Sequence, residues 1–170
     1  MHTLLFLSMR VLHVALAGAW FGAAAFLTLY LIPSVQQLGP AGAPVLAALV
    51  RRGAVKYMAS IGGLTIVTGL YLFWRLTGDP AFPASRGGMA FSIGALTGLI
   101  ALILGGSMVG GSAKKLVALG EKAAGMPDGA ERAAIMNTMN GLRARMLTFG
   151  RIVVALLLVS MAAMALGHYI

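Results

Sequence analysis

The sequence predicts an all-α integral membrane protein, a four-helix transmembrane bundle built as one domain over residues 1–170. Two observations support this fold class, one on composition and one on the length of the apolar segments. Hydrophobic residues make up 59% of the 170 residues and charged residues only 10%, and the mean hydropathy is +0.91. Soluble domains carry about 25% charged residues, so this composition suits lipid rather than water. In addition, four separate stretches reach the roughly 20 apolar residues that a helix needs to cross a bilayer.

The predicted membrane helices cover approximately residues 11–32, 57–76, 89–109 and 150–170. The first is expected to stay in the mature protein, because its apolar run is too long and lacks the preceding basic cluster of a signal peptide. Pro33 is expected to close it. Residues 1–10 either prolong this helix or lie along the membrane interface.

The connections between these helices also contain predicted structure. The segment 44–52 (PVLAALVRR) is typical of an interfacial helix on the inner membrane surface. The segment 77–88 holds two prolines and three glycines, which indicates an ordered outer turn. Two more helices are expected at 114–124 and 130–145, with Asp128 in the break between them as an N-cap. The second of these is expected to continue into the fourth membrane helix.

The basic residues predict the orientation. The chain has 13 Lys and Arg against 4 Asp and Glu, and 10 of the 13 fall on the side of loops one–two and three–four. The positive-inside rule therefore places these loops in the cytoplasm and both termini outside. In such a protein the positive charge faces anionic lipid, so no nucleic acid is expected as a partner. The basic residues on the cytoplasmic side are Arg51, Arg52, Lys56, Lys114, Lys115, Lys122, Arg132, Arg143, Arg145 and Arg151.

Glycines are spaced for close helix packing. Gly18 and Gly22 form one GxxxG step, and Gly94 and Gly98 form another. Small residues let membrane helices approach closely, either inside one bundle or between copies of a chain. The partners expected from these features are the lipid bilayer and either a homo-oligomer or a membrane redox partner.

Common catalytic machinery is absent from the sequence. The predicted membrane helices contain no Asp or Glu in their interiors, which disfavours proton relays and carboxylate-bound metals. The chain has no cysteine and no GxxxxGK[ST] or HExxH element, so thiol chemistry, phosphoryl transfer and zinc proteolysis lack support. No catalytic residue is predicted.

His13 is the first candidate site residue. A titratable imidazole inside a membrane helix is costly unless it is hydrogen-bonded, bound to metal or exposed to water. At about 100° per residue, His13, Ala17, Trp20 and Ala24 share one stripe of the first helix. Either His13 binds a cofactor with Trp20 walling the pocket, or it is a neutral imidazole bonded to the backbone of a neighbouring helix.

A second candidate cluster lies near the C-terminus. Met161, Met164 and His168 follow i, i+3, i+7 spacing and share a helix face in the same leaflet as His13. Imidazole and thioether ligands suit haem iron or Cu(I), so His13 and His168 are the predicted metal ligands. The alternative is that the methionines fill the core and His168 is a solvated end residue.

The pattern Leu12-His13-x6-Trp20-Phe21, followed by Gly22, Phe26 and Pro33, resembles the first helix of the CopD-like copper-resistance group. It is also similar to the first helix of HemJ-type protoporphyrinogen oxidases. The resemblance to the latter implies that His13 is a haem ligand. The whole chain resembles uncharacterised four-helix bacterial membrane proteins related to this group. This resemblance implies that the protein lies in a bacterial inner membrane.

Three functions follow as expectations. The first is a membrane-embedded protein that binds b-type haem or copper and serves electron transfer or cofactor and metal handling. The second is a cofactor-free accessory protein that docks on lipid or a partner. The third is a small transporter or apolar-ligand carrier with a cavity between helices, where Thr65, Thr68 and Thr97 bond either the ligand or their own backbone.

Overall fold

The computed structural model describes residues 2–78, 81–167 and 169–170, and these residues are helical with short connections and no strand. Four helices are long and apolar enough to cross a membrane, which confirms the all-α class and the expected helix number among the described residues. They are Thr3–Gln37, Ala54–Leu76, Arg86–Ala124 and Ala130–Leu166.

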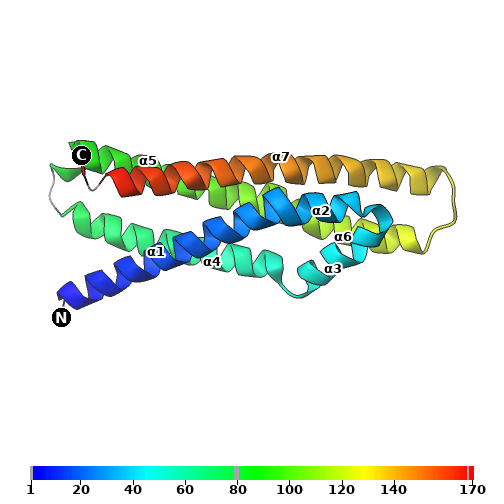
Figure 1. Cartoon of the computed structure of the whole chain (residues 1–170), viewed down its shortest axis with the longest axis horizontal. Helices are drawn as coiled ribbons and strands as arrows, with labels where there is room; N and C mark the ends of the chain where they lie inside the picture. Colours follow the sequence, from blue (N-terminus) through cyan, green and yellow to red (C-terminus); the bar gives the residue numbers. More distant parts are fainter. Residues whose placement is uncertain (1, 79–80, 168) are drawn as a thin grey trace.

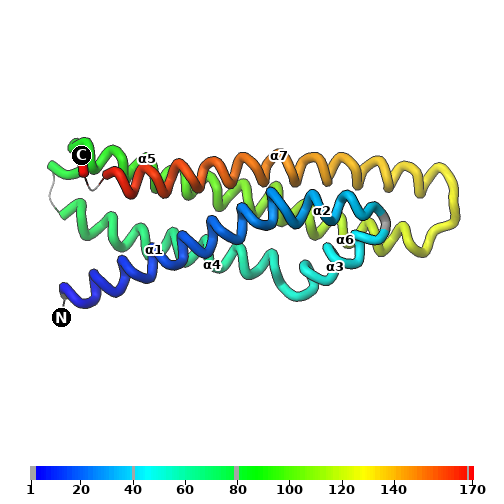
Figure 2. Tube along the Cα trace, in the orientation of Figure 1, coloured from blue at the N-terminus to red at the C-terminus, as the bar shows by residue number. Residues whose placement is uncertain are grey.

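Successive long helices run in opposite directions along the long axis of the molecule, which is horizontal in Figure 1. The starts of α1 and α5 and the ends of α4 and α7 lie at one end, while α2, α3 and the turn from α6 to α7 lie at the other (Figures 1 and 2). The elements in chain order are α1 (His2–Phe26), η1 (Leu27–Leu31), α2 (Ile32–Gln37), η2 (Gly39–Gly42), α3 (Ala43–Arg51), α4 (Ala54–Leu76), η3 (Phe82–Ala84), α5 (Arg86–Leu104), η4 (Gly105–Gly110), α6 (Gly111–Ala124) and α7 (Ala130–Leu166).

The first span is longer than predicted at both ends. Residues from His2 onward prolong the helix, which is the first of the two alternatives for this segment. The prediction that Pro33 closes the helix is wrong, because the chain stays helical to Gln37. The wider π-turn of η1 precedes the proline, and the Ile32 N–H donates to the carbonyl of Leu27. Pro33 then falls in the first turn of α2, where its missing N–H is tolerated.

The third and fourth spans include the two helices that the sequence predicts in the connection between them. Residues 114–124 belong to α6, which continues α5 through η4 without a break. The segment 130–145 runs directly into the last membrane helix, as predicted, and α7 ends at Leu166 rather than 170. Asp128 is not the N-cap as predicted. Gly129 occupies that position without a side-chain bond, and Asp128 forms an ion pair with Arg132.

The remaining boundaries have local causes. The segment predicted at 44–52 is helix α3, and α4 begins at Ala54 because Gly53 turns the chain with a φ of 89°. Such a left-handed conformation favours glycine. The outer turn is shorter than the predicted 77–88, because the hydroxyl of Ser85 accepts the Gly88 N–H at 3.0 Å and starts α5 at Arg86.

Two apolar clusters hold the bundle together. The central cluster joins α1, α4, α5 and α7, and the other joins α6 to the first half of α7. Large apolar side chains also cover the outer faces, which suits helices surrounded by lipid. The buried members of the central cluster are Trp20, Ala24, Ile61, Ala101, Val153 and Leu157.

The two GxxxG steps have different roles. A Cβ at Gly94 would lie 2.7 Å from Met164 Cγ, and one at Gly98 would lie 3.3 Å from Ser160 Oγ. These glycines therefore let α5 approach α7, and Ser160 Oγ donates to the Gly94 carbonyl at 2.7 Å. A Cβ at Gly18 or Gly22 would meet nothing within 4 Å, so that step points away from the described bundle.

Candidate functional site

His13 is hydrogen-bonded to the neighbouring helix α4. Its Nδ1 lies 3.0 Å from the Thr65 carbonyl oxygen and 3.1 Å from Thr68 Oγ1. Because a carbonyl oxygen only accepts, Nδ1 carries the hydrogen and donates it. In the neutral imidazole, Nε2 then keeps the lone pair. The hydrogen bond to the backbone of a neighbouring helix, expected in one of the two interpretations of His13, is therefore present.

The His13 ring fills the space beside a glycine. A Cβ on Gly69 would lie 2.8 Å from His13 Cε1 and 3.3 Å from Nδ1. Gly69 thus allows the imidazole to sit directly against the backbone of α4. This placement makes His13 part of the contact between α1 and α4.

Trp20 faces the same helix as His13, which confirms the stripe predicted on α1. A Cβ on Gly62 would lie 2.9 Å from Trp20 Cε2, and Trp20 is only 4% exposed. Trp20 packs with Ala24 and the central cluster, about two helical turns along α1 from His13.

The described residues show no contact between His13 and the other predicted ligands. Met161 is 38% exposed on α7, and Met164 packs against Gly94 of α5. His168 lies outside the described residues. Those residues contain no group of three or more His, Asp or Glu side chains placed to hold a metal ion. Haem or copper binding by His13 and His168 stays a prediction.

The membrane threonines bond their own helices. The hydroxyls of Thr65, Thr68 and Thr97 each donate to the carbonyl four residues earlier, at 2.7 to 2.8 Å. Of the two roles considered for these threonines, the bond to their own backbone is the one that the structure shows.

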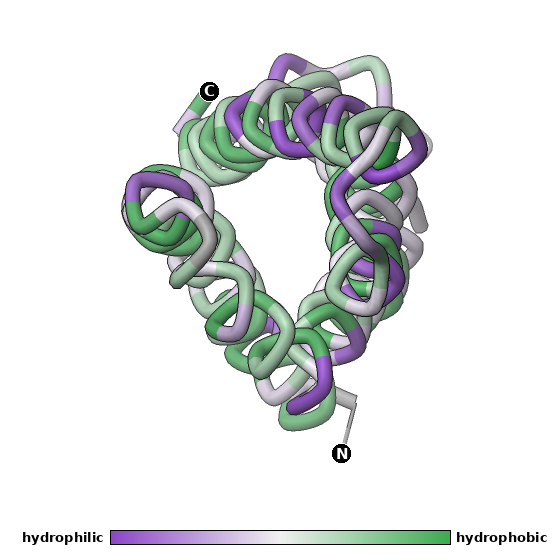
Figure 3. The backbone as a smooth tube through the Cα atoms, turned by 90° about the vertical axis from the view of Figure 1, so that its right-hand side faces the viewer, coloured by the Kyte–Doolittle hydropathy of each residue, from purple (hydrophilic) through white to green (hydrophobic). Residues whose placement is uncertain are grey.

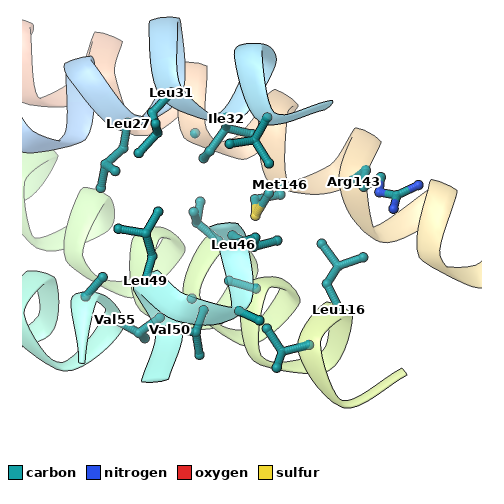
Figure 4. A pocket seen from close by; sticks show the side chains of 18 of the residues that line it. Leu27, Leu31, Ile32, Leu46, Leu49, Val50, Val55, Leu116, Arg143 and Met146 are labelled. Carbon is teal, nitrogen blue, oxygen red and sulfur yellow. The ribbon is translucent and has the colours of Figure 1, made fainter. Parts of the chain in front are cut away.

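A large cavity lies on the α3 side of the bundle. Its volume is about 600 Å³, and its walls come from the end of α1 through α2, from α3, from the start of α4, from η4 and α6, and from α7. Figure 4 shows apolar side chains from these helices around one space. The helices stand in a ring when viewed along the long axis (Figure 3). The labelled apolar residues are Leu27, Leu31, Ile32, Leu46, Leu49, Val50, Val55, Leu116 and Met146.

Both π-helical segments lie at this cavity. Leu27 and Leu31 of η1 line one wall, and Gly105 and Val109 of η4 line another. A π-turn inserts one residue into a helix and is frequent at functional sites. Both spans therefore depart from regular α-helix at the level where they line the cavity.

Helix α3 covers the cavity with one face. Leu46, Ala47 and Val50 line it, whereas Val45 and Ala48 are exposed on the outer face. Apolar residues at this spacing make α3 amphipathic, as the sequence predicted. Leu46 and Val50 of this face also pack against the apolar cluster of α6 and α7.

Few polar side chains reach this space. Of the residues that line it, Thr28, Gln36, Arg51, Glu121 and Arg143 carry a hydroxyl, an amide or a charge. The amide nitrogen of Gln36 is buried and lacks a hydrogen-bond partner among the described residues. Arg51 Nη1 pairs with Glu121 Oε1 at 3.5 Å. Arg143 Nη1 donates to Asn140 Oδ1 at 3.0 Å, which leaves its charge without an acidic partner in the described chain.

Of the residues that line this cavity, the sequence indicates only Trp20 as a site residue, and it does so for a cofactor pocket beside His13 rather than for this space. Two sequence features lie near this cavity: Pro33 within an otherwise helical pattern, and Gly105 next to Gly106 in the third span. Pro33 follows the π-turn of η1 by two residues, and Gly105 begins the π-turn of η4.

Comparisons with family models, with curated proteins and with solved structures found no match to this chain.

Proposed function

We propose that this protein is a membrane-embedded binding protein or carrier for an apolar ligand. The observation that carries the proposal is the apolar cavity of about 600 Å³ between α1–α2, α3, α4, η4–α6 and α7. Ligand sites are typically concave spaces of about 300 to 1,000 Å³ with mostly apolar walls and a few polar groups. This cavity has both properties.

The residues that line the cavity favour an apolar ligand over water or an empty space. Buried water needs two to four polar partners, and the lining residues supply few. An empty space would remove dispersion contacts from the surrounding apolar side chains. An apolar molecule that enters from the bilayer needs no polar partners and restores the dispersion contacts of the apolar side chains.

The test uses Trp20, which lines the cavity and is 4% exposed. The chain has two tryptophans, and Trp74 is 66% exposed, so Trp74→Phe leaves Trp20 as the reporter. The probes are a dibrominated stearic acid and its methyl ester, because bromine quenches indole fluorescence only at contact distance. We expect saturable quenching of Trp20 in the detergent-purified protein by at least one probe.

A matched pair of variants controls this measurement. Ala47→Phe places a ring in the cavity and is expected to reduce quenching of Trp20 at least fivefold. Ala48→Phe, its neighbour on the exposed face of α3, is expected to leave quenching unchanged. Absence of saturable quenching by both probes, or an equal effect of both variants, overturns the proposal.

Haem or copper binding through His13 is a second candidate. The supporting observation is that Nδ1 donates to the Thr65 carbonyl, so Nε2 is the nitrogen available as a ligand. A bonded second nitrogen of this kind orients metal-binding imidazoles in proteins generally. Against it, neither described methionine of the predicted set is shown beside His13.

An ultraviolet–visible spectrum of oxidised and reduced protein, with metal analysis, tests this second candidate. The protein must be expressed with adequate haem and copper. A Soret band or stoichiometric copper that disappears in His13→Ala supports it. A colourless, metal-free preparation excludes it and leaves His13 as a structural residue.

A further inference from the structure

We infer that the ligand is a single-chain amphiphile with a carboxylate head group, which is held between Gln36 and Arg143 at the α3 end of the cavity. This inference rests on the proposed function and specifies its ligand. It concerns two polar residues of a cavity whose lining is otherwise mostly apolar.

The amide of Gln36 supplies an unused donor. Its nitrogen is buried and has no hydrogen-bond partner in the described part of the chain, and Gln36 lines the cavity. A buried donor without an acceptor is costly, and such groups are rare in folded proteins. A ligand oxygen at this end of the cavity would be the missing acceptor.

Arg143 supplies an uncompensated positive charge. It is half-buried on α7 and lines the same cavity (Figure 4). Its described side-chain partner is the neutral amide of Asn140. The acidic side chains that the structure describes are already paired: Glu121 with Arg51, Glu131 with Lys122 and Asp128 with Arg132.

These two groups match a carboxylate better than other head groups. A guanidinium and an amide donor together offset a single negative charge and satisfy oxygen acceptors. A phosphate monoester would bring about −1.5 to −2 charge, which one arginine does not balance. An alcohol or ester head would leave the Arg143 charge without a counter-ion.

The rest of the cavity fits a linear chain. Arg143 and Val153 both line it on α7, and ten helical residues span about 15 Å. Trp20 and Met58 lie at the far, central end with Val153. The space is therefore elongated along the bundle, with charge at one end and apolar walls along its length.

The experiment compares the two brominated probes in the Trp74→Phe protein at neutral to mildly alkaline pH, where the acid is ionised. We expect the acid to quench Trp20 with at least tenfold higher affinity than its methyl ester, because charge-assisted hydrogen bonds are the stronger ones. Arg143→Gln and Gln36→Leu are expected to weaken binding of the acid about tenfold and about threefold, and to leave binding of the ester unchanged. Arg151→Gln, an exposed arginine outside the cavity, is the matched control and is expected to change neither.

The outcomes separate the two proposals. Equal affinity for acid and ester, or an unchanged affinity for the acid in Arg143→Gln, overturns the carboxylate inference while the ligand-binding function stands. Failure of both probes to quench Trp20 overturns both. Retained binding of the ester shows that each variant is folded.

Discussion

The imidazole of His13 occupies the position that a side chain at Gly69 would take, since a Cβ there would lie 2.8 Å from His13 Cε1. Seven residues further along α1, Trp20 has the same relationship to Gly62 of α4. The two helices are antiparallel, so a ring on α1 meets a glycine on α4 at both levels. This register places His13 within reach of the Thr65 carbonyl and Trp20 at the floor of the cavity.

Gly69→Ala is expected to destabilise the bundle. The added methyl group would push the imidazole of His13 away from α4 and weaken its bond to Thr65. Overpacking of this kind costs about 1 to 3 kcal/mol. Gly63→Ala is the control on the same helix, because a Cβ there meets nothing within 4 Å. Thermal unfolding in detergent should show a lower Tm for Gly69→Ala alone, and equal Tm values would contradict the observed contact.

His13→Leu tests the hydrogen bond itself. Interhelical hydrogen bonds in membrane proteins average about 0.6 kcal/mol, with an upper range near 1.7 kcal/mol. A loss of stability in that range is expected, while Val14→Leu on the exposed face should have no effect. A double-mutant cycle with Thr68→Val, measured by unfolding in mixed micelles, should give a non-zero coupling. Strictly additive effects would argue that Thr68 does not share the Nδ1 hydrogen.

Gly94→Leu is expected to separate α5 from α7. The new side chain would meet Met164 Cγ and the Ser160 carbonyl, which lie 2.7 and 3.1 Å from the position of a Cβ. We expect a loss of at least about 2 kcal/mol in the free energy of unfolding. Gly22→Leu, in the other GxxxG step, should leave the stability of the bundle unchanged. The same samples run on a sizing column would show whether the outward step forms a contact between copies, because Gly22→Leu would then change the size of the particle.

The orientation in the membrane can be tested directly, because the chain contains no cysteine. Ala84→Cys lies in the connection between α4 and α5, and Ala130→Cys lies at the opposite end, where α7 begins. Both positions are exposed. The positive-inside rule predicts that a membrane-impermeant maleimide labels Ala84→Cys on intact bacterial cells and Ala130→Cys only after permeabilisation. The reverse pattern would invert the proposed topology.

Local sequence patterns were sufficient for the helices but not for all of their ends. Apolar length predicted the four spans, and amphipathic spacing predicted α3. The predictions based on Pro33 and Asp128 were wrong for the end of the first helix and for the N-cap of α7. Proline stops a helix, and aspartate caps one, only in a suitable local structure. At Pro33 a preceding π-turn keeps the chain helical, and at Asp128 the carboxylate pairs with Arg132 instead of capping α7.

For the site, too, the sequence predicted one part and the tertiary structure decided the rest. Helical periodicity alone placed His13 and Trp20 on one face, since residue spacing on a helix determines which side chains share a direction. It did not determine which helix that face meets, which GxxxG step is internal, or that a cavity is present. Those properties depend on contacts between residues far apart in the chain, such as Gln36, Leu116 and Arg143 around one space. The composition and order of the apolar segments therefore determined the class of protein and its helices, whereas the packing of the helices decided where His13 is bonded and where a ligand can bind.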